Sequence, residues 1–238
     1  MTETAAGAEN PHQNVSFASN GGTAHGYLAV PDSGSGPGLV VIQEWWGLTE
    51  HIKDVTDRFA REGFVALAPD LFGGRTTHDS DEAGELMQNL PVTKAATDLA
   101  GAVEFLRSHE AVTSQTVGAV GFCMGGGFVL VLAAQQGDRV GAAVPFYGVG
   151  GYDQVDLGGI TAPVLGHFGT EDGFAPPEQV DALEAQLQEK AKGSVEIVRY
   201  EGAGHAFFND EDHLGTYDAD LAAQAWSRTV EFLRANVR

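Results

Sequence analysis

The sequence predicts an α/β protein with a mostly parallel, doubly wound sheet of about seven or eight strands and helices on both faces. Three observations predict it: short β-rich runs alternate with helical patterns, several runs are continuously apolar, and no repeat or linker divides the 238 residues. Continuously apolar strands are typical of a sheet that helices cover on both sides. Alternation of strands and helices is typical of parallel sheets.

The expected elements follow one another in a regular order. We expect strands at residues 25–30, 38–44, 64–70, 116–122, 142–148, 162–168 and 194–200. We expect helices at residues 51–63, 92–110, 176–193 and 218–237, and a helix of small and apolar residues directly after the fourth strand. Glycines end the first and third of these helices, and prolines open the third. In such a sheet, catalytic residues belong on loops at the carboxyl ends of the strands.

The chain is strongly acidic, with 13 lysines and arginines against 33 aspartates and glutamates, and a net charge of −20. Such a surface repels nucleic acid and anionic membranes, so we expect neither as a partner. No apolar run approaches the ~18 residues that span a bilayer. With 43% hydrophobic residues, the chain can bury one large core, so we expect a flexible segment at residues 1–14 and a single domain at residues 15–238.

The single cysteine, Cys123, excludes an intramolecular disulfide and favours a reducing compartment. The first residues lack a basic region followed by an apolar stretch, so we expect no secretory signal. We therefore expect a cytoplasmic protein that is a monomer or a weak homo-oligomer.

Cys123 stands in a Gly-x-Cys-x-Gly motif, between a β-run and a helical run. This is the nucleophile-elbow pattern of the α/β-hydrolase fold, with cysteine where serine usually stands. Glycines are needed there because a sharp strand-to-helix turn strains the backbone of the nucleophile and leaves no room for neighbouring side chains. At a helix N-terminus, the helix dipole would favour the thiolate of Cys123.

A nucleophile of this kind needs a base and a carboxylate that orients the base, and α/β-hydrolases place them in the order nucleophile, acid, histidine. The strand that ends at residue 168 leads into an acidic loop that contains Glu171 and Asp172. The next strand leads into a glycine-rich loop that contains His205. We expect Cys123, His205 and Asp172 to form a triad, although the order alone leaves Glu171 open as the acid.

Glu44 follows an apolar strand directly, where a carboxylate is costly to bury unless it is paired. We expect it at the catalytic edge of the sheet. The backbone N–H of Trp45 is placed to form an oxyanion hole with that of Met124, the residue after the nucleophile. We expect Trp46 to shape an apolar pocket.

Two other histidines have non-catalytic interpretations. His167 lies within an expected strand, where we expect it to be packed or hydrogen-bonded. His213 lies in an acidic loop, but no spacing there matches a known metal-ligand pattern. We therefore expect neither a metal nor a cofactor.

These residues resemble the dienelactone hydrolase family over nearly the whole chain from about residue 15. The resemblance rests on Gln43-Glu44 before Gly47, the Ala68-Pro69-Asp70-Leu71-Phe72 strand end, Gly-Phe-Cys-Met-Gly-Gly, the Gly-Thr-Glu-Asp-Gly-Phe loop and the histidine of Glu-Gly-Ala-Gly-His-Ala-Phe. It implies a Cys–His–Asp set at Cys123, His205 and Asp172. It also implies that Glu44 holds the resting thiol until the substrate displaces it.

The sequence departs from the family where members that cleave dienelactone hold the substrate carboxylate with arginines. Neither the segment at residues 79–90 nor the one directly after His205 contains an arginine, and Arg75 is the nearest cation. We expect a hydrolase whose substrate is a small-molecule carboxylic ester or lactone. We expect Trp46, Arg75 and Phe207 to contact this substrate. The alternatives are a general carboxylesterase or thioesterase for uncharged esters, or a non-catalytic thiol-sensing or binding protein on the same fold.

Overall fold

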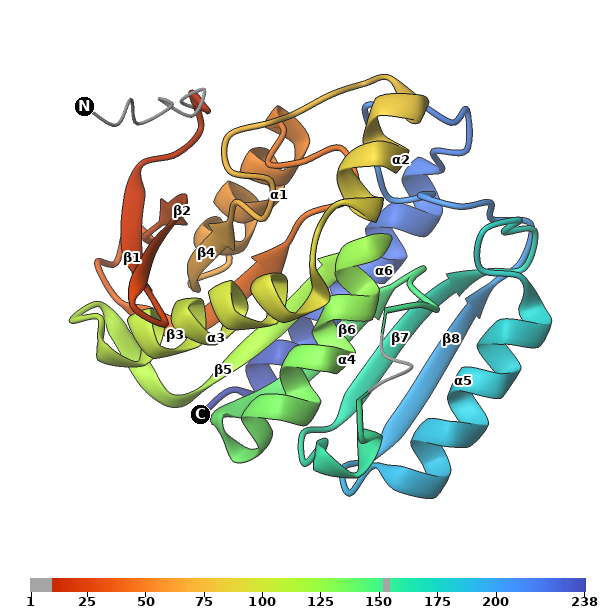
Figure 1. Ribbon diagram of the computed structural model, residues 1–238. Coiled ribbons are helices and arrows are strands. Elements are labelled where there is room, and N and C mark those ends of the chain that lie inside the picture. Colours follow the sequence, from red (N-terminus) through yellow and green to blue (C-terminus); the bar gives the residue numbers. More distant parts are fainter. Residues whose placement is uncertain (1–9, 152–154) are drawn as a thin grey trace.

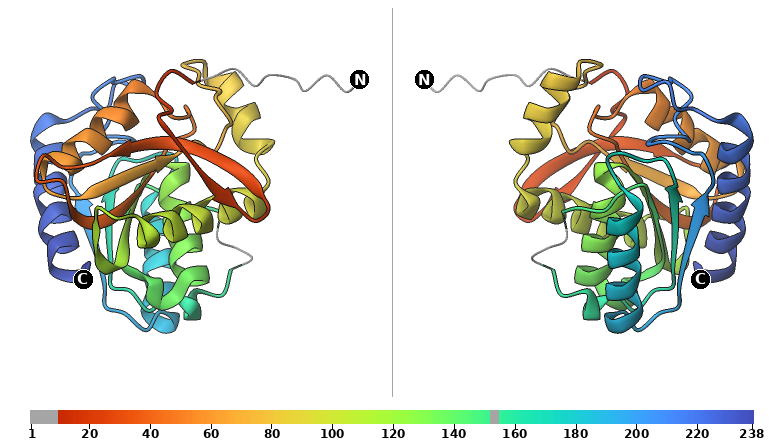
Figure 2. Two further views of the ribbon diagram at one scale, coloured as in Figure 1. Left: turned by 90° about the vertical axis from the view of Figure 1, so that its left-hand side faces the viewer. Right: turned by 90° about the vertical axis from the view of Figure 1, so that its right-hand side faces the viewer.

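The computed structural model describes residues 10–151 and 155–238, and it shows one eight-stranded sheet between two layers of helices (Figures 1 and 2). The strands are arranged in the order β1-β2-β4-β3-β5-β6-β7-β8. β2 pairs antiparallel with β1 and β4, and the remaining neighbours are parallel. The predicted fold, a mostly parallel α/β-hydrolase sheet, is confirmed.

All seven expected strands are present, with ends that differ by a few residues, and one more precedes them. The strands are β1 (Val15–Ser19), β2 (Gly22–Ala29), β3 (Gly36–Ile42), β4 (Val65–Pro69), β5 (Val112–Phe122), β6 (Val140–Phe146), β7 (Val164–Gly169) and β8 (Val195–Tyr200). The helices are α1 (Glu50–Arg61), α2 (Ser80–Gln88), α3 (Val92–Ser108), α4 (Met124–Gln136), α5 (Pro177–Lys190) and α6 (Ala219–Asn236), with short 3-10 turns at Gly137–Arg139 and Leu157–Gly159.

β1 was not among the expected strands, although its turn has a recognisable chemistry. It is joined to β2 by Asn20 and Gly21, which both have positive φ, as the tight two-residue turn of a β-hairpin requires. α2 was also not expected as a separate helix. The side chain of Asp79 accepts a hydrogen bond from Glu82 N and caps its first turn.

The central strands are buried on both faces, and alternate residues of one strand belong to different cores. Val40 and Ile42 belong to the core to which α3, α4 and α5 contribute, whereas Leu39 and Val41 belong to the core to which α1 and α6 contribute. Figure 2 shows these two helical layers from the sides. The continuously apolar runs therefore have the physical cause that the sequence predicted: each face of the sheet is covered.

The expected flexible segment at residues 1–14 falls largely on residues 1–9, which lie outside the described residues. Residues 10–14 contact the domain instead: Asn10 is buried and donates to Leu48 O, and Gln13 donates to Asp70. Within the described ranges, no helix combines the length and the apolar composition that crossing a membrane requires.

Candidate active site

Cys123 connects the carboxyl end of β5 to the N-terminus of α4 in a strained backbone conformation. Its φ is 53° and its ψ is −119°, a region that residues other than glycine rarely adopt. Backbone bonds hold it there, because Cys123 N donates to Phe146 O at 3.1 Å and its carbonyl accepts from Gly126 N at 2.9 Å. The structure therefore has the sharp turn that the Gly-x-Cys-x-Gly motif predicts.

The two motif glycines allow this turn to pack closely against its neighbours. A Cβ on Gly121 would lie 2.3 Å from Gly125 O, and a Cβ on Gly125 would lie 2.5 Å from the carbonyl oxygens of Ile42 and Gln43. No side chain fits at such distances. The close approach brings the end of β3, and with it Glu44 and Trp45, to the nucleophile turn.

His205 and Asp172 come from the loops that follow β8 and β7. His205 Nδ1 lies 2.8 Å from Asp172 Oδ2, and both residues are buried. The other carboxylate oxygen, Oδ1, accepts the backbone N–H groups of Phe174 and Ala175 at 2.8 Å each, which fixes the direction of the side chain. Glu171, the other acid of this loop, is exposed and is not hydrogen-bonded to His205 among the described residues.

His205 has a strongly raised pKa because of its two neighbours. Burial alone lowers it, but the hydrogen bond to Asp172 and the charge of the nearby Cys123 outweigh burial and raise the pKa of His205 to about 10. Its Nε2 is buried and makes no well-formed hydrogen bond with any described residue. A cysteine is activated when a neighbouring imidazolium stabilises its thiolate and a carboxylate binds one nitrogen of that imidazolium.

Glu44 is buried at the carboxyl end of β3, where two neutral donors satisfy its carboxylate. Tyr147 donates its hydroxyl to Oε1 at 3.1 Å, and Asn209 donates Nδ2 to Oε2 at 2.6 Å. The contact with the Cys123 thiol that the family resemblance implies is not among the hydrogen bonds of the described residues. The structure thus shows Glu44 in a position that leaves the thiol free.

Tyr147 and Asn209 are the two site residues that the sequence did not identify. Tyr147 follows β6 directly, at the same edge of the sheet as Cys123, and its φ is 38°. Burial and the nearby Glu44 charge raise its pKa, so the hydroxyl keeps its proton and remains a donor. Its position after a strand next to β5 could have identified it, whereas Asn209 lies in a long loop and has no such signal.

The two backbone N–H groups that we expect to form the oxyanion hole donate no hydrogen bond to the described residues. The backbone N–H groups of Met124, at the first position of α4, and of Trp45 have no hydrogen-bond partner among the residues that the structure describes. Both belong to segments that the nucleophile turn brings together. They are therefore available to a developing oxyanion beside Cys123.

Cys123 and His205 open into a cavity of about 540 Å³ with an apolar wall. The other lining residues are Trp45, Met87, Leu90, Val92, Met124, Phe128, Tyr147, Gly148, Val149, Gly150, Gly151, Phe174 and Gln179. Among the described residues, no lysine, arginine, aspartate or glutamate lines this cavity. A volume of this size suits a small organic molecule.

The three residues expected to contact the substrate do not line this cavity. Trp46 is buried and packs its ring edge against His213, with 5.5 Å between the ring centroids. Arg75 is exposed and pairs with Glu82 at 2.9 Å. Phe207 is fully buried beside Tyr147 because it packs into the core under the site.

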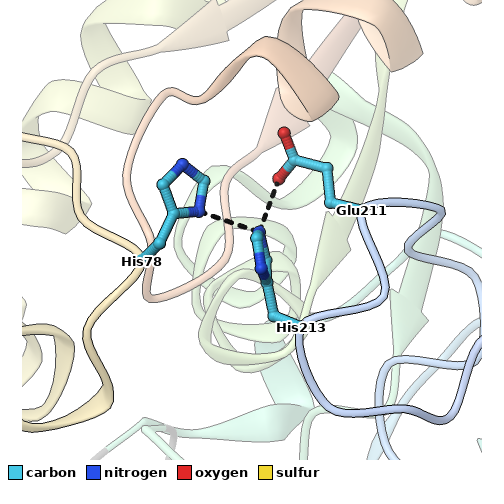
Figure 3. A group of neighbouring side chains, drawn as sticks. All are labelled: His78, Glu211 and His213. Carbon is cyan, nitrogen blue, oxygen red and sulfur yellow. Dashed lines mark hydrogen bonds and ion pairs between the residues drawn. The ribbon is translucent and has the colours of Figure 1, made fainter.

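Three side chains that could bind a metal ion lie together outside the cavity. His78, Glu211 and His213 come together from two loops, and their ligand atoms all lie within 4.8 Å of one another (Figure 3). No sequence pattern predicts that they meet, because His78 precedes His213 by 135 residues.

Comparisons with known proteins agree on one family. The model of the dienelactone hydrolase family matches residues 24–237. A protein named usf from Aquifex pyrophilus is 36% identical, with 93% of this chain and 97% of that protein covered. A protein from Aquifex aeolicus named for carboxymethylenebutenolidase activity is 32% identical, with 95% and 99% covered. A crystal structure named as a dienelactone hydrolase from Klebsiella pneumoniae has a TM-score of 0.81 and 29% identity, with 92% and 96% covered.

Proposed function

The chain belongs to the dienelactone hydrolase family and is an ester or lactone hydrolase, and we propose that it cleaves an uncharged substrate through a thioester on Cys123. The observation that carries this proposal is that Cys123 and His205 line one apolar cavity while Asp172 contacts His205 from behind it. The three residues follow three different strands, so only the folded chain brings them together. They act as a nucleophile, a base and a carboxylate that orients the base.

In the first step, the Cys123 thiolate attacks the carbonyl carbon of the ester. The carbonyl oxygen becomes an oxyanion, which the N–H groups of Met124 and Trp45 stabilise. As the oxyanion collapses, the bond from carbon to the leaving oxygen breaks and the His205 imidazolium gives that oxygen its proton. The products of this step are a thioester on Cys123 and an alcohol, which stays attached to the acyl group when the substrate is a lactone.

In the second step, water hydrolyses the thioester, and the altered environment of His205 makes this step feasible. The charge of Cys123 helps to hold the pKa of His205 at about 10, and acylation removes that charge. Burial, which lowers the pKa, then has more weight, so the neutral imidazole becomes accessible and can accept a proton from water. Attack by this water and cleavage of the carbon–sulfur bond release the acid and restore the thiolate.

The cavity favours an uncharged acyl group. Its wall carries aromatic and aliphatic side chains, and its described residues include no arginine or lysine that could neutralise a substrate carboxylate. Burial of an unpaired carboxylate would be costly. We therefore propose a neutral, apolar ester or lactone as the substrate class.

Glu44 is proposed to act on the thiol and not on the substrate. It is absent from the cavity wall, and Tyr147 and Asn209 hold its carboxylate beside the nucleophile turn. The family resemblance implies that the substrate displaces Glu44 from the thiol. Tyr147 and Asn209 would hold the carboxylate in this displaced position.

Hydrolysis of a neutral activated ester, such as p-nitrophenyl butyrate, tests the proposal. We expect turnover by the untreated protein and its loss after iodoacetamide treatment, because Cys123 is the one cysteine in the chain. Saturating ester should protect against alkylation. A thiol-sensing or binding protein would be alkylated but would show no turnover before treatment, and that result would reject the proposed hydrolysis.

A further inference from the structure

We propose that His78, Glu211 and His213 form a binding site for a divalent transition-metal ion, with Zn²⁺ as the best-suited ion. The site lies outside the catalytic cavity, between the loop from β4 to α2 and the loop from β8 to α6 (Figure 3). The proposal is independent of the hydrolytic mechanism, because it concerns three residues that do not line the catalytic cavity.

The donor atoms of the three side chains converge on one point. His78 Nδ1 lies 2.8 Å from His213 Nε2, and Glu211 Oε2 lies 3.1 Å from the same nitrogen. Figure 3 shows the His78 and Glu211 side chains both directed at His213. The ligand atoms of a tetrahedral zinc site are separated by roughly 3.3 Å, given bonds of about 2.0–2.1 Å. Small outward shifts of these side chains, which are at least partly exposed, would therefore accommodate the ion.

Hydrogen bonds alone satisfy this cluster poorly. A ring nitrogen carries either one proton or one lone pair, so His213 Nε2 cannot accept from His78 and donate to Glu211 at the same time. It could serve both contacts only as a bifurcated donor. A cation placed between the three groups would use one lone pair from each of them, and every ligand atom would then have a partner.

The ligand types select the class of ion. Two imidazoles and a carboxylate suit Zn²⁺ and its neighbours in the transition series, while Ca²⁺ and Mg²⁺ prefer sites made of oxygen ligands. The exposed position of His78 leaves a fourth place open to water. The net charge of −20 raises the local concentration of cations around the protein.

Such an ion would fasten two loops that support the active site. Trp46, which directly follows the oxyanion residue Trp45, packs its ring against His213 and accepts a hydrogen bond from Thr77 N at 3.0 Å. On the other loop, Glu211 N donates to Asn209 Oδ1 at 2.9 Å. Asn209 in turn holds Glu44, so the metal would be a structural support two contacts away from the catalytic edge.

Calorimetric titration of the Cys123→Ala protein with ZnCl₂, after dialysis against EDTA, tests the proposal. This background removes the thiolate beside His205, which could itself bind zinc. We expect one ion per chain with a Kd of about 1 μM or lower. At about 100-fold excess of free Zn²⁺ over this Kd, the Tm should rise by roughly 5 °C or more.

Variants of the ligands give the specificity control. His78→Ala and Glu211→Gln, each in the Cys123→Ala background, should weaken Zn²⁺ binding by at least about tenfold and reduce the shift of Tm. His25→Ala and Glu201→Gln, which change exposed residues outside the cluster, should bind Zn²⁺ like their parent. Absence of binding at 100-fold higher Zn²⁺ than the expected Kd, or equal binding by the ligand variants and the controls, would overturn the proposal.

Discussion

His205 Nδ1 lies 2.8 Å from Asp172 Oδ2, and the partner oxygen of that carboxylate is held by two backbone N–H groups. The carboxylate therefore has one orientation, and it presents Oδ2 to the imidazole. This fixes which ring nitrogen faces Asp172 and leaves Nε2 without a hydrogen-bond partner among the described residues.

From this relationship we expect that Asp172→Asn lowers kcat/KM by several orders of magnitude, with ~10⁴ as the loss in a serine triad. The amide cannot stabilise the imidazolium. Glu171→Gln is the matched control, because it changes the adjacent exposed acid and should keep the rate within about tenfold. Steady-state hydrolysis of a neutral activated ester measures both. The reverse pattern of rates would reassign the orienting acid to Glu171.

We expect Glu44→Gln to keep the fold and to lower the rate of thiol alkylation and of ester hydrolysis by about tenfold or more. The substitution removes the charge that the Tyr147 hydroxyl and the Asn209 amide stabilise. The pH dependence of iodoacetamide alkylation and of kcat/KM measures the effect, with Glu201→Gln as an exposed control. Profiles that match those of the wild type would show that Glu44 has no part in activating the thiol.

We expect neutral phenyl esters to react with higher kcat/KM than a lactone that carries a carboxylate. Arg75 is exposed and paired with Glu82, so Arg75→Ala should change either rate by less than about threefold. Conversely, Gln179→Arg would place a cation on the cavity wall and should raise kcat/KM for the anionic lactone several-fold. A strong preference for the anionic lactone that Arg75→Ala abolishes would make Arg75 a substrate clamp.

The buried His167 should make the protein acid-sensitive. Its Nδ1 contacts Tyr200 and its Nε2 contacts Thr229, and burial lowers its pKa to about 3. The unfolded chain, with a pKa of about 6.5, takes up the proton first, so this stability is present above pH 6.5 and is lost as the pH falls toward 3. Between pH 7 and pH 4 the loss is on the order of 3 kcal/mol for this group.

Urea unfolding of the wild type and of His167→Gln at these two pH values measures that difference. The variant should be less stable at pH 7, because the packed imidazole is lost, but its free energy of unfolding should fall less between pH 7 and pH 4. An equal fall in both proteins would show that His167 does not titrate on unfolding.

The sequence was sufficient to predict the turn at Cys123 because its requirements are local. A chain that bends sharply between β5 and α4 needs glycines where a Cβ would meet backbone at 2.3–2.5 Å, and these glycines are visible in the motif. The loops of Asp172 and His205 were also predictable, because parallel strands end at one edge of the sheet. The order of the residues left Glu171 open, and the choice of Asp172 depended on the family resemblance.

Contacts between segments that are distant in the sequence were harder to predict. Tyr147 and Asn209 meet Glu44 across 103 and 165 residues, so neither pairing has a pattern in the sequence. His78 and His213 are likewise far apart in the sequence, with a separation of 135 residues, so their pairing was not predicted either. Trp46 and Phe207 were expected at the cavity, but both side chains are buried in the core and do not line it.

Mass spectrometry of the acyl-enzyme tests the central claim most directly. The protein is mixed with excess p-nitrophenyl butyrate, quenched in acid within the first turnover and digested. The mechanism predicts a butyryl group on the peptide that contains Cys123, and the adduct should be absent from Cys123→Ala protein treated in the same way. An adduct on another residue, or undiminished hydrolysis by Cys123→Ala, would contradict the assignment of Cys123 as the nucleophile.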